Sequence, residues 1–160
     1  MSKVHGIVYA YHSSPRLGDL TRYRTNASLP FCGRYRLIDF ALSSLSNAGV
    51  HSVGVIMQRD YQSLLDHIGS GKPSRFGLCA EPEYLKTPPF GVNTRGDYTG
   101  TAEALNAVIS YVRNIPESEI VLMPADIVCN LALAAAIAQH DASGCGITAI
   151  CRSGAVTGEH

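Results

Sequence analysis

Residues 35–57, YRLIDFALSSLSNAGVHSVGVIM, contain a helix, its stop signal and a buried strand in immediate succession. Ile38, Ala41, Leu42 and Leu45 recur at the spacing of one helical face, and Asn47-Ala48-Gly49 supplies the stop, so the pattern predicts a helix over 35–47. The apolar, β-branched run Val53–Met57 predicts a strand fully covered on both faces. This pairing is typical of an α/β fold.

The same alternation continues in both directions along the chain. Upstream, the run 4–11 predicts another buried strand; downstream, the pattern predicts a helix over 61–68, a helix over 100–113 and a buried strand over 120–123. A further helix is expected after an Asn130 cap, and a last strand over 146–151. We therefore predict a mostly parallel sheet with helices on both faces. Residues 69–97, rich in glycine and proline, are expected to form a functional loop.

The composition narrows the classes of function. Of the 160 residues 46% are hydrophobic, enough to bury a core, and 13 basic side chains balance 13 acidic ones. A net charge of zero argues against a nucleic-acid partner. No apolar run approaches the ~20 residues of a membrane span, and the first residues lack the apolar stretch of a signal peptide, so we expect a soluble, cytoplasmic protein.

The five cysteines point to the same compartment. They are odd in number, contain no CxxC pair, and mostly have apolar neighbours. We therefore expect reduced thiols that act as small core hydrophobes, rather than a zinc site or disulfides.

One family resemblance accounts for most of these segments. The stretch 30–49, PFCGRYRLIDFALSSLSNAG, resembles the sugar-nucleotide pyrophosphorylases and most closely the glucose-1-phosphate adenylyltransferases. The segments 55–58, 63–73, 100–105 and 124–126 resemble the same family in the same order. The resemblance implies a Rossmann-like nucleotide-diphospho-sugar transferase fold, and an activity that joins ATP and glucose 1-phosphate into ADP-glucose and pyrophosphate.

The resemblance breaks down where the family binds phosphate. Such enzymes have a loop G-G-x-G-T-R-L followed by a Lys-Pro pair; here the loop positions read YHSSPRL over 11–17, and the pair is Asn26-Ala27. Side chains in place of three glycines occupy space that a triphosphate needs, and Pro15 lacks an amide donor. We infer a degenerate, regulatory or weakly catalytic subunit of the GlgD type in glycogen biosynthesis. The alternative is an active adenylyltransferase with an altered loop.

The resemblance also suggests site residues. Arg16 is the remaining candidate catalytic residue of the loop; Gln58, Gly100 and Thr101 are candidates for nucleotide binding; and Asp126 is a candidate ligand for Mg²⁺ if nucleotide still binds. All of these except Arg16 have a plainer interpretation: Gln58 as a solvated residue, Gly100-Thr101 as a helix cap, and Asp126 as the cap of a following turn.

Arg34 and Arg36 belong to a basic stretch with five arginines between positions 16 and 36. Arginine offers paired donors to phosphate, so these two side chains are candidates for a sugar-phosphate effector site. A contact with another subunit or a solvated face is the alternative interpretation.

The resemblance finally suggests how the chain is organised. Residues 1–160 correspond to the N-terminal part of a nucleotidyltransferase domain, and the C-terminal β-helix domain of the family has no counterpart in them. We expect a homo- or hetero-oligomer, with a catalytic adenylyltransferase subunit as the partner.

Overall fold

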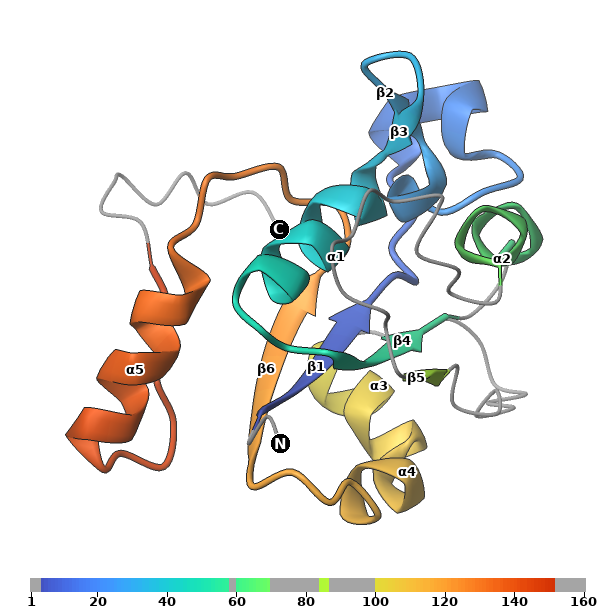
Figure 1. Cartoon of the computed structure of the whole chain (residues 1–160). Coiled ribbons are helices and arrows are strands. Elements are labelled where there is room, and N and C mark those ends of the chain that lie inside the picture. Colours follow the sequence, from blue (N-terminus) through green and yellow to red (C-terminus); the bar gives the residue numbers. More distant parts are fainter. Residues whose placement is uncertain (1–3, 58–59, 70–83, 87–99, 152–160) are drawn as a thin grey trace.

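A four-stranded parallel sheet forms the centre of the computed structural model, which describes residues 4–57, 60–69, 84–86 and 100–151 (Figure 1). The strands are β1 (Val4–Tyr9), β4 (Ser52–Ile56), β5 (Tyr84–Lys86) and β6 (Glu119–Pro124). Their order is β5-β4-β1-β6, and every neighbouring pair is parallel. The predicted α/β class is therefore confirmed.

Helices cover both faces of this sheet. Successive side chains of β1 point to opposite faces, so neighbouring residues of this strand pack in different clusters. Val4 and Val8 pack in one apolar cluster, and Ile7 packs in another. The first cluster includes residues of α1 (Leu37–Asn47), α2 (Gln62–Ile68) and α5 (Leu133–Ser143). The second includes residues of α3 (Thr101–Ala107) and α4 (Ile109–Arg113), and Figure 1 shows α1 and α3 on opposite sides of the sheet.

The helix α1 forms where the sequence pattern predicts it. The helix begins where the Arg36 amide donates to Asp39 Oδ2 at 2.8 Å, and it buries Ile38, Ala41, Leu42 and Leu45. Gly49, with φ of 77°, lets the chain turn back so that the Val50 amide donates to the Leu45 carbonyl at 3.0 Å. This turn leads directly into β4.

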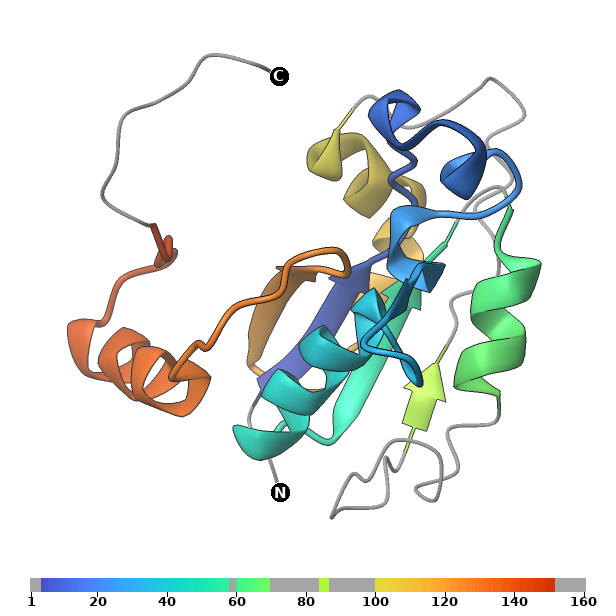
Figure 2. The same cartoon turned by 90° about the horizontal axis from the view of Figure 1, so that it is seen from above.

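A small irregular unit lies between β1 and α1. It contains the 3-10 helices η1 (Pro15–Thr21) and η2 (Asn26–Ser28) and a hairpin of β2 (Pro30–Phe31) and β3 (Tyr35–Arg36). The hairpin turn has positive φ at Cys32 and Gly33. Figure 2 shows the unit near the end of the sheet to which β1 points.

The structure corrects several local predictions. The helix expected over 100–113 is interrupted at Val108, where φ is −109° and ψ is 21°. The cap of α5 is Ala132 rather than Asn130. Residues 146–151 form no strand, and Ile147 is 89% exposed. A strand requires a hydrogen-bonded neighbour, and within the described ranges β6 pairs only with β1.

The structure also corrects the predictions for the cysteines and for the segment 69–97. Cys32, Cys129, Cys145 and Cys151 are exposed rather than in the core, because they lie in a turn and in irregular connections; Cys79 lies outside the described residues. The sequence predicts a loop over 69–97, but Tyr84–Lys86 within it adds a parallel strand to β4. Apart from Gly69 and β5, that segment lies outside the described residues.

The order of the strands indicates where a ligand would bind. From β1 the sheet is extended by β4 and β5 on one side and by β6 on the other, so the strand order reverses between β1 and β6. This place is called the switch point below. In open parallel sheets ligands bind beyond the carboxyl ends of the strands at such a point.

Among the described helices, none has the length and apolar character required to cross a bilayer.

Candidate functional site

The carboxyl ends of β1, β4 and β6 are joined by hydrogen bonds that continue past the strands. The Ala10 amide donates to the Ile56 carbonyl at 2.9 Å, and the Ala125 amide donates to the Tyr9 carbonyl at 3.0 Å. These bonds hold the segment after β1 beside the residue that follows Ala125, which is Asp126. Two segments far apart in the sequence therefore meet at the switch point.

The segment after β1 is folded on itself through its own side chains. Thr21 Oγ1 donates to the Ser14 carbonyl at 2.9 Å, and Ser13 Oγ donates to the Thr21 carbonyl at 3.2 Å. Pro15 begins η1, and Gly18 kinks it with φ of 52° and ψ of −127°. Side-chain hydrogen bonds and Pro15 thus shape this segment, which stands where the family that the sequence resembles has a glycine-rich loop.

Asp126 is a partly exposed carboxylate with neighbours from this segment. The Asn26 side-chain amide donates to Asp126 Oδ2 at 3.0 Å, and His12 Nδ1 lies 3.9 Å from the same oxygen. Its side chain is 22% exposed. Sequence reasoning identified Asp126, but it noted Asn26 only as the replacement of a lysine and gave His12 no catalytic role. It did not place either residue beside Asp126, because residues a hundred or more positions apart show no joint pattern in one sequence.

Aromatic rings line the same strand end. The rings of Tyr11 and His12 meet edge to face at 4.6 Å, and Tyr9 meets His12 edge to face at 5.8 Å. Burial raises the pKa of Tyr9, and the charge of Asp126 adds to the rise, whereas a hydrogen bond with the Thr101 side chain lowers it. Thr101 is therefore brought to this cluster at the first turn of α3.

The remaining predicted site residues are placed as follows. Arg16 lies in η1 and is exposed, and Gly100 precedes α3 in an extended conformation, with its carbonyl accepting the Ala104 amide at 3.1 Å. Gln58 lies outside the described residues. The structure thus brings Asp126 and Thr101 toward one cluster. The roles of Asp126 in metal binding and of Thr101 in nucleotide binding stay predictions.

Asp126 can serve as one ligand of a magnesium ion. Mg²⁺ in nucleotide sites is usually held by one or two carboxylates together with phosphate oxygens and water. Within the described ranges no group of three or more His, Cys, Asp or Glu side chains could hold a metal. Asp126 therefore fits the ion only as a single ligand, and Asn26 already donates to one of its oxygens.

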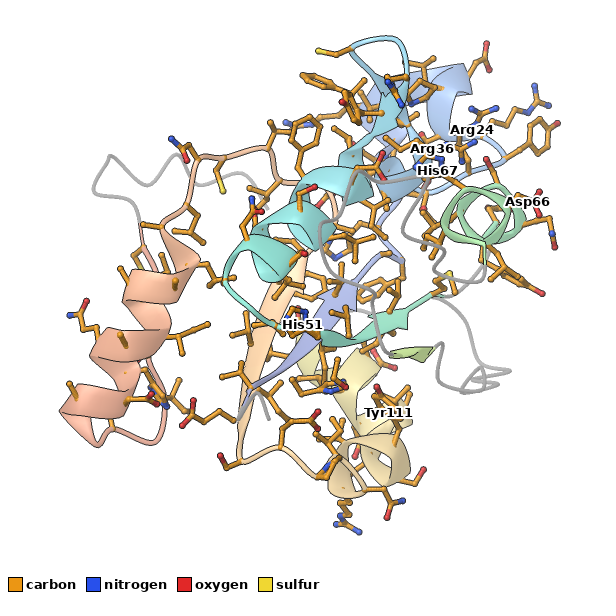
Figure 3. All side chains as sticks on the ribbon, viewed as in Figure 1. Arg24, Arg36, His51, Asp66, His67 and Tyr111 are labelled. Carbon is orange, nitrogen blue, oxygen red and sulfur yellow. The ribbon has the colours of Figure 1, made fainter. Side chains whose placement is uncertain are left out.

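Arg36 is engaged within the chain, whereas Arg34 is exposed. The Arg36 guanidinium donates to the Ser63 carbonyl and, at 2.8 Å, to Ser63 Oγ, so it links the hairpin to α2. Burial and the neighbouring Arg24 lower the pKa of Arg36, and Asp39 and Asp66 oppose that shift. Figure 3 shows Arg24, Arg36 and His67 near α2. Arg34 instead lies over the Tyr35 ring, 5.7 Å from its centre.

A second polar cluster lies away from this edge, under α4. His5 is 2% exposed; its Nε2 lies 2.9 Å from the Tyr111 hydroxyl and its Nδ1 lies 2.8 Å from Ser52 Oγ. Glu117 Oε2 is 3.6 Å from Nδ1. Burial, with a smaller contribution from Glu117, raises the pKa of Tyr111 to about 12. The cluster fastens α4 to the amino ends of β1 and β4, and its position indicates a structural role.

Comparison with known proteins agrees with the fold. A family model described as nucleotidyl transferase matches residues 6–158. A glucose-1-phosphate adenylyltransferase of Thermomicrobium roseum is 36% identical over 143 residues, covering 88% of this chain and 33% of that protein. The glycogen biosynthesis protein GlgD of Geobacillus stearothermophilus is 32% identical over 149 residues, covering 93% of this chain and 43% of that protein.

A solved structure gives the same fold. It is that of a putative glucose-1-phosphate thymidylyltransferase from Bacillus anthracis in complex with a sucrose; it superposes with a TM-score of 0.65 at 20% identity, covering 87% of this chain and 50% of that one. The present chain spans less than half the length of the two curated relatives above. The match over residues 6–158 nevertheless covers nearly the whole sequence, and the chain belongs to the nucleotidyl transferase family.

Proposed function

We propose that the chain is the N-terminal part of the nucleotidyltransferase domain in a cytoplasmic subunit of ADP-glucose pyrophosphorylase, acting in glycogen biosynthesis. Its role is regulatory or weakly catalytic. The observation that carries this proposal is the altered loop after β1, where the Ser14 amide is already bonded to Asn26 Oδ1 at 3.0 Å and Pro15 has no amide hydrogen.

The loop chemistry supports impaired phosphate binding. A triphosphate is bound by free backbone amides that approach it closely and by positive charge. Asn26 brings no charge, and Tyr11 and His12 fill the strand end with rings. A single preorganised donor is worth about 2.7–4 kcal/mol in a transition state, so the loss of several leaves catalysis weak.

The chain retains groups that would act on a nucleotide if one binds. Asp126 would hold Mg²⁺, which would neutralise phosphate charge, and Arg16 would add a positive charge beside the loop. Thr101 would donate or accept a hydrogen bond at the first turn of α3. These groups favour the second candidate function, an active glucose-1-phosphate adenylyltransferase that uses ATP and glucose 1-phosphate.

The relatives suggest the partner. Proteins named GlgD and proteins named glucose-1-phosphate adenylyltransferase are both similar to this chain. We propose that it assembles with a catalytic adenylyltransferase subunit, as part of an oligomer. The exposed Arg34 is the candidate contact for a sugar-phosphate effector or for that subunit, and Arg36 supports the hairpin that presents it.

Isothermal titration calorimetry with MgATP separates the two candidate functions. The regulatory subunit is expected to show no saturable heat alone, and to change the rate of ADP-glucose formation when it is added to the catalytic enzyme. An active enzyme would bind MgATP alone, and the D126N variant would lose that binding. Saturable binding that depends on Asp126, with no effect on the catalytic enzyme, would overturn the proposal.

A further inference from the structure

Asn26 makes one hydrogen bond to Asp126, which follows β6, and two to the segment 12–14, which follows β1. Its side-chain amide donates to Asp126 Oδ2 at 3.0 Å, and its side-chain oxygen accepts the Ser14 amide at 3.0 Å. Its own backbone amide donates to the His12 carbonyl at 2.8 Å. One uncharged residue therefore ties the segment after β1 to the residue that follows β6.

The two side-chain bonds fix the orientation of the amide. In the opposite orientation the carbonyl oxygen would face the Asp126 carboxylate, and the NH₂ group would face the Ser14 N–H; both contacts would be repulsive. The amide hydrogen therefore points at Asp126 Oδ2, the oxygen that also lies 3.9 Å from His12 Nδ1. A cation that binds this oxygen must share it with a hydrogen-bond donor or displace that donor.

We propose that Asn26 is a positioning residue that holds the segment 12–14 against Asp126 and competes with a divalent cation for the carboxylate by donating to Oδ2. The inference rests on the proposed function, since the cation in question is the one that accompanies a nucleotide. Its consequence is a site closed by the hydrogen bonds of the chain itself and poor in affinity for metal. Opening it costs the bonds to Asp126 and Ser14.

The N26D variant tests this arrangement, because it changes the donor into a carboxylate of the same shape. Two carboxylates then face each other beside His12. We expect a lower melting temperature in EDTA at neutral pH, because like charges repel. We also expect Mn²⁺, followed by electron paramagnetic resonance without nucleotide, to bind at least ten-fold more tightly than to the wild-type chain and to restore the melting temperature.

Two control variants define the site of any metal bound. The double variant N26D/D126N is expected to lose the gain, because one of the two carboxylates is gone. N114D adds the same charge at an exposed asparagine that donates to the Ser110 carbonyl, and it is expected to bind Mn²⁺ like the wild type. A folded N26D variant that binds Mn²⁺ no more tightly than N114D would overturn the proposal.

The N26A variant keeps the proposal testable if N26D fails to fold. It removes the donor and the acceptor without adding charge, so the Ser14 amide is expected to exchange with deuterium at least ten-fold faster. Unchanged exchange at Ser14 in N26A would overturn the role of Asn26. Neither experiment involves nucleotide or ADP-glucose, so failure of the proposed function would leave these outcomes as they are.

Discussion

His67 Nε2 lies 2.8 Å from Asp39 Oδ1 and 3.0 Å from Asp39 Oδ2, and this contact joins α2 to the first turn of α1. Asp39 is 6% exposed, and it also accepts the Arg36 amide at the start of α1. One buried carboxylate thus caps a helix and holds a second helix next to the irregular unit after β1. Both helices contact η2 of that unit.

Replacing Asp39 by alanine is expected to lower the free energy of unfolding by about 1–3 kcal/mol, because a cap and a buried hydrogen-bond partner are lost together. Urea unfolding followed by circular dichroism measures the change. The matched control is D19A, an exposed aspartate in η1, for which we expect a change within about 0.5 kcal/mol. Equal effects of the two variants would contradict the role assigned to Asp39.

Tyr111 makes stability depend on pH at the alkaline end. Its pKa is raised from 10.0 to about 12 in the folded chain, so the unfolded chain loses this proton first as the pH rises. The contribution of Tyr111 to stability is therefore complete below pH 10 and declines between about pH 10 and 12. Y111F is expected to be less stable near neutral pH, because the bond to His5 is lost, and to show a shallower decline. Parallel curves for the two proteins above pH 10 would refute this.

Gly54 leaves room for the same tyrosine. A Cβ added at Gly54 would lie 2.6 Å from the Tyr111 hydroxyl oxygen and 3.0 Å from ring atom Cε1. G54A must therefore displace Tyr111 from His5, and we expect a loss of about 1–3 kcal/mol of stability. G146A is the control, since no atom lies within 4 Å of its added Cβ. The loss should shrink when G54A is made in a Y111A background; an undiminished loss there would place its cause elsewhere.

The sequence alone predicted the elements whose signals are local. The apolar spacing of α1 and the buried runs of β1 and β4 follow from burial against a neighbouring layer, and these elements form as expected. The strand β6 also forms, but it is not buried throughout as predicted, because Ile120 and Leu122 are exposed. The run 146–151 has the same local character but forms no strand, because strand formation depends on a partner that the run itself does not encode. Val108 likewise interrupts a continuous apolar stripe.

The candidate site was predictable only in part. Asp126 was recognisable because it follows a strand at the expected end of the sheet. Asn26 drew attention only as a missing lysine; its bonds to Asp126 and Ser14 depend on the fold that brings residues 100 positions apart together. The cysteines were predicted to be buried because their neighbours in the sequence are mostly apolar, but the four that the structure describes are exposed. Burial depends on the fold and not on sequence neighbours alone.

The rate of ADP-glucose formation from ATP and glucose 1-phosphate, measured on the complete protein in which this sequence occurs, tests the central claim most directly. The altered loop after β1 predicts a kcat/KM at least about 100-fold below that of a catalytic glucose-1-phosphate adenylyltransferase assayed in parallel. A factor of about 100 is what the loss of a single transition-state donor costs. A kcat/KM equal to that of the catalytic enzyme, abolished by D126N, would contradict the account.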